Sequence, residues 1–220
     1  MNIFCNLPAP LAKEMDGKKT THNYKRGQTI FYEGNAPFGI YCIFSGKVKL
    51  FSTSANGKQM ILKVLKAGDV LGYRSLFSSE PYAATAEVIE DGEVCFIEKD
   101  AFMKAISSNT ATGWNVIKLL SCELGHAERK VTDVATKSAR VRMAELLLML
   151  KATYGKKDKK GILLDIRLKR EELAEMIGIT QETAIRLISE FKEDGILNLE
   201  DHNIWIINPE KLTSLTDLPY

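Results

Sequence analysis

The chain has 220 residues, of which 45% are hydrophobic and 26% charged, and its formal net charge is +2. This composition is that of an ordinary globular protein and excludes a wholly disordered or fibrous chain. Because the net charge is close to zero, a surface that binds nucleic acid has to be a local cluster of basic residues. The length favours two domains, each able to bury a core of its own.

The N-terminal segment, MNIFCNLPAPLAKEMDGKK, has no basic stretch followed by an apolar run, so it lacks the pattern of a signal peptide. The longest apolar run, AELLLML, is far shorter than the ~20 residues that cross a bilayer. We therefore predict a cytoplasmic protein without a membrane partner.

The cysteines are spread along the chain, with no CxxC pair and none of the clustering that is typical of zinc or iron–sulfur sites. They are Cys5, Cys42, Cys95 and Cys122. We interpret them as reduced and mostly buried thiols, and we predict no metal site.

Residues 24–97 have the pattern of short antiparallel strands separated by turns. Glycines separate short runs rich in Ile, Val, Phe and Tyr, and Asn56-Gly57 stands between VKLFST and QMILKVL. Asn-Gly is a strong hairpin signal because both residues tolerate a positive φ. Many short strands at this spacing favour an antiparallel sandwich or small barrel over a parallel sheet, whose strands need helical crossovers.

Residues 112–137 have a helical period instead. Apolar or small residues recur alternately four and three positions apart, which places them on one stripe of a long helix. An amphipathic helix packed on its own domain would also show such a stripe, but this one is narrow and flanked by charge, which favours a two-stranded coiled coil. We therefore predict a homodimer, with Gly113 as the weakest member of its seam. The seam consists of Gly113, Ile117, Leu120, Leu124, Ala127, Val131 and Val134.

The last third of the chain predicts a helix-turn-helix followed by a β wing. It begins with the helical run SARVRMAELLLMLKATYG and a polar loop, KKDKKG, which we interpret as a solvated turn. Leu173, Ala174 and Ile177 then form the inner face of one helix. Gly178 suits a left-handed C-cap and Thr180 caps the next helix, which makes the tight turn of this motif. The second helix has an inner face of Ala184, Leu187, Ile188 and Phe191, and the strands GILNLE and NIWIIN form the wing.

A β-roll, a dimerising helix and a winged helix-turn-helix in this order resemble the Crp/Fnr family of bacterial transcription regulators. The resemblance extends from Tyr24 to Pro209 and rests on GQTIFYEG, YCIFSGKVKL, GDVLG and ITQETAIRLISEFKEDGIL. It implies an α+β fold with a jelly-roll-like antiparallel β-roll in residues 1–111, a dimerisation helix in 112–137 and a winged helix-turn-helix in 138–220. The implied function is that of a homodimeric regulator that binds a palindromic DNA duplex and, if it is an activator, RNA polymerase.

The second helix of the helix-turn-helix carries the residues expected to read DNA bases. Arg186 can donate two hydrogen bonds to guanine and Glu182 can accept one from cytosine, and both match the family's base readers. Gln181 suits adenine, and Ile185 can contact a thymine methyl group. The alternative is a simple i, i+4 ion pair between Glu182 and Arg186 on a solvated helix. For contacts with phosphate we predict Lys169, Arg170, Thr180 and Thr183.

The stretch GYRSLFSSEPYAATAE, which begins at Gly72, has the layout of the family's cyclic-nucleotide cassette without its ligand-binding residues. Members that bind cyclic AMP have a Glu for the ribose and an Arg-Ser pair for the phosphate, where this chain has Tyr73, and Tyr82 with Ala83. A buried phosphate without a paired cation is costly, so the sequence argues against cyclic AMP. The groups left to hold an anion are the backbone N–H groups from Gly72 to Ser75 and the side chain of Arg74.

Other occupants of this pocket remain open. Tyr73 and Tyr82 can fill it themselves, or it holds an unidentified effector, with Gly125 and His126 at the places where cyclic-AMP-binding members have Thr and Ser. Haem needs an axial ligand, and the candidates His22 and His126 are each isolated, as structural histidines usually are. An iron–sulfur cluster would need more cysteines ahead of the roll than Cys5. We therefore predict no cofactor.

A rival function is a β-roll regulatory subunit that binds a small effector and controls a partner protein. The winged helix-turn-helix argues against it, because such a subunit needs no helix that reads a DNA groove. The sequence shows no nucleophile–base arrangement, P-loop or metal motif, so we do not expect an enzyme.

Overall fold

The computed structural model describes residues 19–201 and 203–216. The chain divides into two compact units, and the boundary between them lies after Ala127, inside a long helix. Cys5 and the outer ends of the two predicted terminal domains lie outside the described residues. No helix of the described part combines the length and the hydropathy needed to cross a bilayer.

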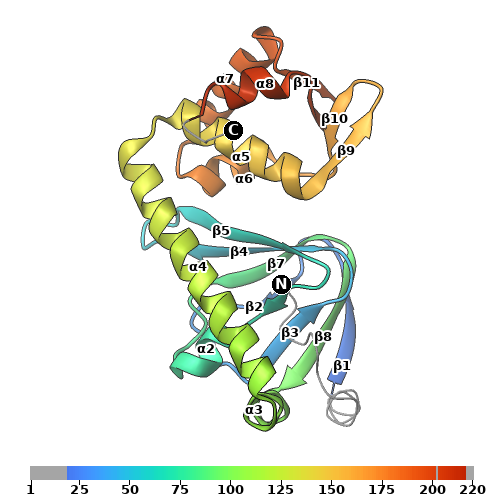
Figure 1. The fold of residues 1–220 in the computed structure, drawn as a ribbon, viewed down its shortest axis with the longest axis vertical. Helices are drawn as coiled ribbons and strands as arrows, with labels where there is room; N and C mark the ends of the chain where they lie inside the picture. Colours follow the sequence, from blue (N-terminus) through green and yellow to red (C-terminus); the bar gives the residue numbers. More distant parts are fainter. Residues whose placement is uncertain (1–18, 202, 217–220) are drawn as a thin grey trace. The chain divides into compact units, whose positions relative to one another are not determined.

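The first unit contains two four-stranded sheets in which every pairing is antiparallel (Figure 1). The first sheet has the order β1 (Lys19–Tyr24), β8 (Gly92–Glu98), β3 (Gly39–Ile43) and β6 (Val70–Leu71). The second has the order β2 (Thr29–Phe31), β7 (Thr85–Glu90), β4 (Lys47–Thr53) and β5 (Gln59–Lys66). The predicted antiparallel, jelly-roll-like roll is confirmed.

The roll is held together by apolar side chains that point inward from alternate positions along the strands. Val48 of β4, Leu65 of β5 and Val88 of β7 are each 1% exposed and belong to one buried cluster. The turn between β4 and β5 contains Gly57 at a φ of +80°, which confirms the hairpin predicted from the Asn-Gly pair.

The helices among the described residues of the first unit are α2 (Tyr73–Ser78), α3 (Lys99–Ser108) and α4 (Thr110–Thr136), the last of which also runs into the second unit. Phe102 and Ala105 of α3 and Val116 of α4 pack into a second buried cluster with residues of β3 and β8. This packing fixes the first turns of α4 on the roll. The long helix itself is confirmed within two residues of its predicted bounds.

The second unit is the predicted winged helix-turn-helix (Figure 1). Its helices are α5 (Ala139–Tyr154), α6 (Arg170–Ile177), α7 (Gln181–Glu193) and α8 (Pro209–Thr213). Its antiparallel sheet has the order β11 (Leu197–Glu200), β12 (Asn203–Ile206), β10 (Gly161–Leu164) and β9 (Gly155–Asp158).

One segment of the second unit differs from the sequence prediction. The polar loop KKDKKG contributes to strand β9, which pairs with β10. The indole Nε1 of Trp205 donates a hydrogen bond of 2.8 Å to Asp158, which ties the end of β9 to β12. The strand therefore forms as one arm of a local hairpin with β10, held at its end by the distant Trp205, although all four of its residues are exposed.

Candidate nucleic-acid interface and effector pocket

The turn between α6 and α7 has the geometry of a helix-turn-helix. The buried Glu172 carboxylate accepts a hydrogen bond of 2.8 Å from the Lys169 N–H and so caps the start of α6. Gly178 ends α6 in the left-handed conformation, at a φ of +70°. The Thr180 hydroxyl then caps α7 by accepting a hydrogen bond from the N–H of Thr183. These caps confirm the predicted turn.

Helix α7 has two distinct faces. Its buried face packs into the unit and consists of the predicted Ala184, Leu187, Ile188 and Phe191. The opposite face is exposed and carries Gln181, Glu182, Ile185, Arg186 and Ser189. All four residues predicted to contact bases therefore lie on one solvent-exposed helical face.

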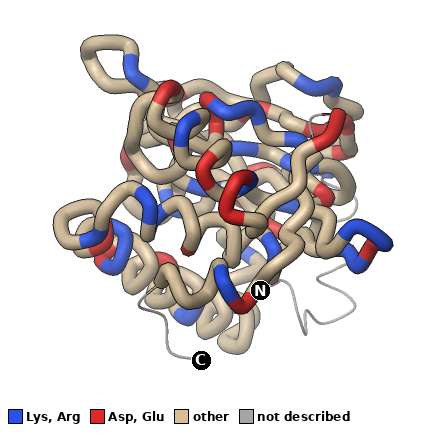
Figure 2. The backbone as a smooth tube through the Cα atoms, turned by 90° about the horizontal axis from the view of Figure 1, so that it is seen from above, with Lys and Arg blue, Asp and Glu red and all other residues tan. Residues whose placement is uncertain are grey.

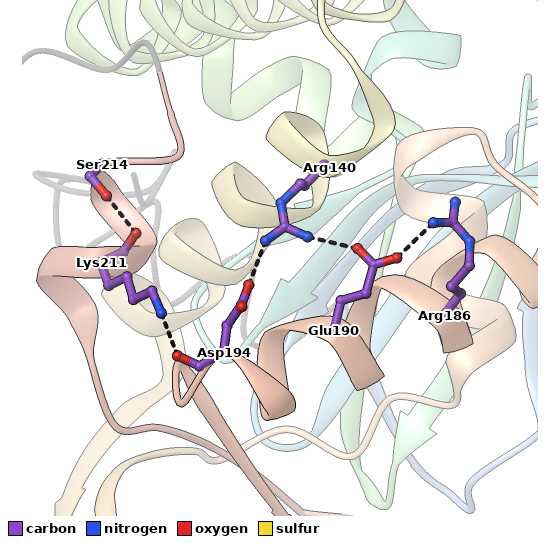
Figure 3. A network of polar contacts seen from close by, with 6 residues as sticks. All are labelled: Arg140, Arg186, Glu190, Asp194, Lys211 and Ser214. Carbon is purple, nitrogen blue, oxygen red and sulfur yellow. Dashed lines mark hydrogen bonds and ion pairs between the residues drawn. The ribbon is translucent and has the colours of Figure 1, made fainter.

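Arg186 is ion-paired in the free protein, but with a different residue from the one that the sequence suggested. Its Nη1 lies 2.7 Å from Oε1 of Glu190, one turn further along α7 (Figure 3). The other oxygen of Glu190 lies 2.6 Å from Nη1 of Arg140, which comes from α5. Sequence reasoning missed both partners; Glu190 carries the same i, i+4 signal as Glu182, whereas nothing in the sequence connects Arg140 with α7.

Glu182 is held in its ionised form at the start of α7. A hydrogen bond from its own backbone N–H, and a second from the Thr180 hydroxyl, lower the pKa of its carboxyl group. The positive end of the helix dipole favours the same charge state. A carboxylate at this position can accept hydrogen bonds but cannot donate them.

The four residues predicted to contact phosphate lie at the first turns of the two helices. Lys169 and Thr180 are exposed N-cap residues, whereas Arg170 and Thr183 are half-buried. The hydroxyls of Thr180 and Thr183 lie 3.1 Å apart. Helix N-termini present unpaired N–H groups that suit phosphate. Figure 2 shows basic and acidic residues interspersed along the chain, so positive charge for DNA has to come from such local groups.

The cassette that begins at Gly72 forms a tight turn and a short helix. Gly72 has a φ of +83°, and a Cβ there would lie 3.2 Å from the Gly39 carbonyl oxygen and 3.3 Å from the Tyr82 ring. Tyr73, Ser75 and Tyr82 are buried, whereas Arg74 and Ala83 are exposed. The Ser75 hydroxyl donates to the Pro81 carbonyl group. The cation of Arg74 is thus exposed, and the buried Ser75 hydroxyl is used within the cassette.

Tyr82 packs inside the roll as part of its core. Its ring stacks on Phe31 with 3.9 Å between the centroids, and its hydroxyl donates to the Gly39 carbonyl oxygen at 3.4 Å. Burial, together with the neighbouring Tyr41 hydroxyl, raises the pKa of Tyr82 well above its ordinary value. The phenol is therefore a neutral, 5% exposed member of the cluster that also contains Val48 and Val88.

Tyr73 connects the cassette to α4. Burial and a hydrogen bond to the Glu123 carboxylate raise the pKa of its hydroxyl. The same carboxylate lies 2.5 Å from Nζ of Lys63 on β5. The contact thus comes from Glu123, which sequence reasoning did not select; the predicted Gly125 is half-buried and His126 is exposed.

The predicted seam of α4 is largely uncovered. The exposed fractions of Ile117, Leu124, Val131 and Val134 are 53%, 61%, 73% and 45%. Ala127 is also exposed, whereas Leu120 is partly buried against the α3–α4 cluster. An exposed apolar stripe of this length indicates a contact surface.

The three cysteines of the described residues differ in burial, because Cys95 is buried, Cys42 is half-buried and Cys122 is exposed, whereas mostly buried thiols were expected. Cys42 and Cys95 face each other across β3 and β8, and burial raises the pKa of the Cys42 thiol to about 12. His22 and His126 are exposed. In the described ranges, no three His, Cys, Asp or Glu side chains are placed to hold a metal ion.

Comparison with family models assigns the two halves of the chain separately. Residues 21–109 match a cyclic nucleotide-binding domain, and residues 141–215 match a Crp-like helix-turn-helix domain. The first match covers the β-roll described above, and the second covers the winged helix-turn-helix.

Individual relatives match over nearly the whole chain. The anaerobic regulatory protein of Bacillus subtilis is 26% identical over 89% of this chain and 82% of its own length. The CRP-like cAMP-activated global transcriptional regulator of Mycobacterium tuberculosis is 25% identical over 86% of this chain and 85% of its own. The solved structure of FixK2 from Bradyrhizobium japonicum has the same fold, with a TM-score of 0.79 and 23% identity over 92% of this chain and 99% of its own. The Bacillus subtilis and Mycobacterium tuberculosis relatives are named as regulators rather than as enzymes.

Proposed function

Because the chain belongs to the Crp/Fnr family of transcription regulators, we propose that it is a homodimer that reads a palindromic DNA site through α7. The observation that carries this proposal is the exposed face of α7, on which Glu182 and Arg186 stand one turn apart. This face opposes a fully buried one, so the helix can enter a major groove without disturbing the core.

The two side chains suit the two halves of one base pair. The guanidinium group of Arg186 can donate two parallel hydrogen bonds to guanine, and the ionised carboxylate of Glu182 can accept one from cytosine. Gln181 and Ile185 extend the same face toward neighbouring base pairs. Lys169, Arg170, Thr180 and Thr183 then contact phosphates and set the register of the protein on the duplex.

Dimerisation is supported by the exposed stripe on α4. Ile117, Leu124 and Val131 recur every seven residues, which is the spacing that keeps one helical stripe against a partner helix. Two copies related by a two-fold axis present two α7 helices to one duplex. If the protein activates transcription, RNA polymerase is its further partner.

Selection of binding sites from random duplexes tests the proposed function. The enriched sites should be palindromes whose half-site centres lie about 34 Å apart, because each α7 has to meet the same face of the duplex. Each half-site should contain a G·C pair. Enrichment of sites without two-fold symmetry, or no enrichment at all, would show that the protein is not a dimeric sequence reader.

For the effector pocket we propose that its own tyrosines fill it. Tyr82 occupies the core of the roll by stacking on Phe31, and Tyr73 is committed to Glu123. The exposed Arg74 offers no buried cation to a phosphate. Cyclic AMP would have to displace packed aromatic rings and leave its own charge unpaired, which opposes binding.

Cyclic AMP should therefore leave the melting temperature of the protein unchanged. A ligand stabilises a protein only to the extent that it binds the folded state, so even millimolar cyclic AMP should produce no shift. Thermal melting monitored by circular dichroism measures this directly. The Mycobacterium tuberculosis relative, named as cAMP-activated, serves as the positive control. A saturable rise in the melting temperature would refute the self-filled pocket.

A further inference from the structure

The guanidinium group of Arg140 contacts Glu190 and Phe191 of α7 and Asp194, the C-cap residue of this helix. Figure 3 shows its ion pairs with Glu190 and Asp194. Nη1 lies 2.6 Å from a carboxylate oxygen of Glu190, and Nη2 lies 2.6 Å from a carboxylate oxygen of Asp194. The guanidinium carbon stands 4.9 Å from the centroid of the Phe191 ring. The planar fork of arginine presents one Nη to each carboxylate and its flat face to the ring, a fixed geometry that the point charge of a lysine ammonium does not impose.

The Glu190 carboxylate is shared between two arginines. One oxygen contacts Arg140 and the other contacts Arg186, so the three side chains form a continuous row from α5 to the exposed face of α7. Exposure rises along this row, from about a third for the side chains of Arg140 and Glu190 to 64% for Arg186. The row therefore starts at the half-buried Arg140 and ends at the exposed Arg186.

This arrangement reduces the conformational entropy that the Arg186 side chain loses when it binds DNA. A long exposed side chain samples many rotamers and gives up that freedom on docking, which weakens binding. A side chain already held by a fixed carboxylate gives up less. The Glu190 carboxylate also divides its negative charge between Arg140 and Arg186. It therefore orients Arg186 without binding it so strongly that Arg186 cannot contact a base.

We propose that Arg140 is a positioning residue for base recognition, acting on Arg186 through Glu190. The inference rests on the proposed function, in which Arg186 reads a G·C pair. The simpler alternative is that Arg140 only fastens α5 to α7 and adds positive charge to the unit. If Arg140 positions Arg186, its loss lowers the discrimination between base pairs. If it only fastens the helices and adds charge, its loss leaves that discrimination unchanged.

The experiment uses full-length Arg140→Gln, Arg140→Lys, Glu190→Gln and Arg186→Ala proteins. Affinity is measured for the selected palindrome, for the same duplex with the G·C pair of each half-site replaced by A·T, and for an unrelated duplex. The ratio of the first two affinities is the discrimination. The affinity for the unrelated duplex reports the sequence-independent electrostatic contribution.

Positioning predicts one pattern across these variants. Arg140→Gln and Glu190→Gln should both lower the discrimination by about fivefold to tenfold, because ordering one rotamer-rich side chain contributes a few-fold in each half-site. Their affinities for the unrelated duplex should move in opposite directions, since one variant loses a cation and the other an anion. Arg140→Lys should keep that affinity and still discriminate less, because an ammonium lacks the planar pair of Nη groups that contact Glu190 and Asp194 separately.

Each outcome distinguishes the inference from the function on which it rests. Arg186→Ala with unchanged discrimination refutes Arg186 as a base reader, and the positioning role of Arg140 falls with it. If Arg186→Ala discriminates less but Arg140→Gln and Glu190→Gln retain the wild-type ratio, only the positioning role is wrong. Wild-type discrimination by Arg140→Lys would also contradict the positioning role, because it would show that a positive charge at position 140 is enough. Should Arg140→Gln fail to fold by circular dichroism, Glu190→Gln decides the question.

Discussion

Replacing Leu124 by Glu should convert the protein from a dimer to a monomer. Leu124 is 61% exposed within its own chain and lies in the middle of the apolar stripe of α4. In a two-stranded coiled coil its two copies face each other, so the substitution buries two carboxylates without cations. Burial of unpaired charge costs several kcal/mol, and each 1.4 kcal/mol raises the dissociation constant about tenfold.

Sedimentation velocity at micromolar concentration measures this change. Thr132→Glu is the matched control, because it adds the same charge to the same helix at an exposed position next to the stripe member Val131. That protein should sediment as a dimer. A Leu124→Glu protein that also remains dimeric would show that α4 does not form the interface.

Arg186→Ala should abolish the preference for the G·C pair in each half-site. Loss of a bidentate contact with guanine costs ~1 to 3 kcal/mol, and a dimer loses it twice. The substitution also removes the ion pair with Glu190, but an exposed i, i+4 pair is worth only ~0.3 to 0.5 kcal/mol. The stability of the fold should therefore change little while the specificity changes greatly.

Lys169→Ala provides the contrast to this variant. Lys169 stands at the N-cap of α6, and a phosphate contact from it carries no sequence information. Its loss should weaken binding to all duplexes alike and make the salt dependence shallower. Binding-site selection on both variants and the wild type measures the difference. If Arg186→Ala still selects the same G·C pair, Arg186 is merely the ion-pair partner of Glu190.

Many features of the fold follow from short stretches of sequence. The Asn56-Gly57 hairpin and the Gly178 turn depend on the φ preferences of single residues. The long helix predicted for residues 112–137 depends on the periodicity of its apolar residues. The exposed face of α7 follows in the same way, because four buried positions fix where the remaining side chains point. Local chemistry of this kind acts before tertiary contacts form, so it can be derived from the residues themselves.

Other features were decided by tertiary structure. The hairpin of β9 and β10 is held in a sheet by the distant β12, which pairs with β10 and whose Trp205 donates a hydrogen bond to Asp158, although the stretch by itself looks like a solvated turn. Glu123 contacts Tyr73 because the helix α4 and the roll bring together side chains that lie far apart in the chain. Arg140 reaches Glu190 for the same reason, across two helices. Ion pairs and hydrogen bonds select partners by distance in space, and a distance between remote residues has no periodicity or turn signal to indicate it.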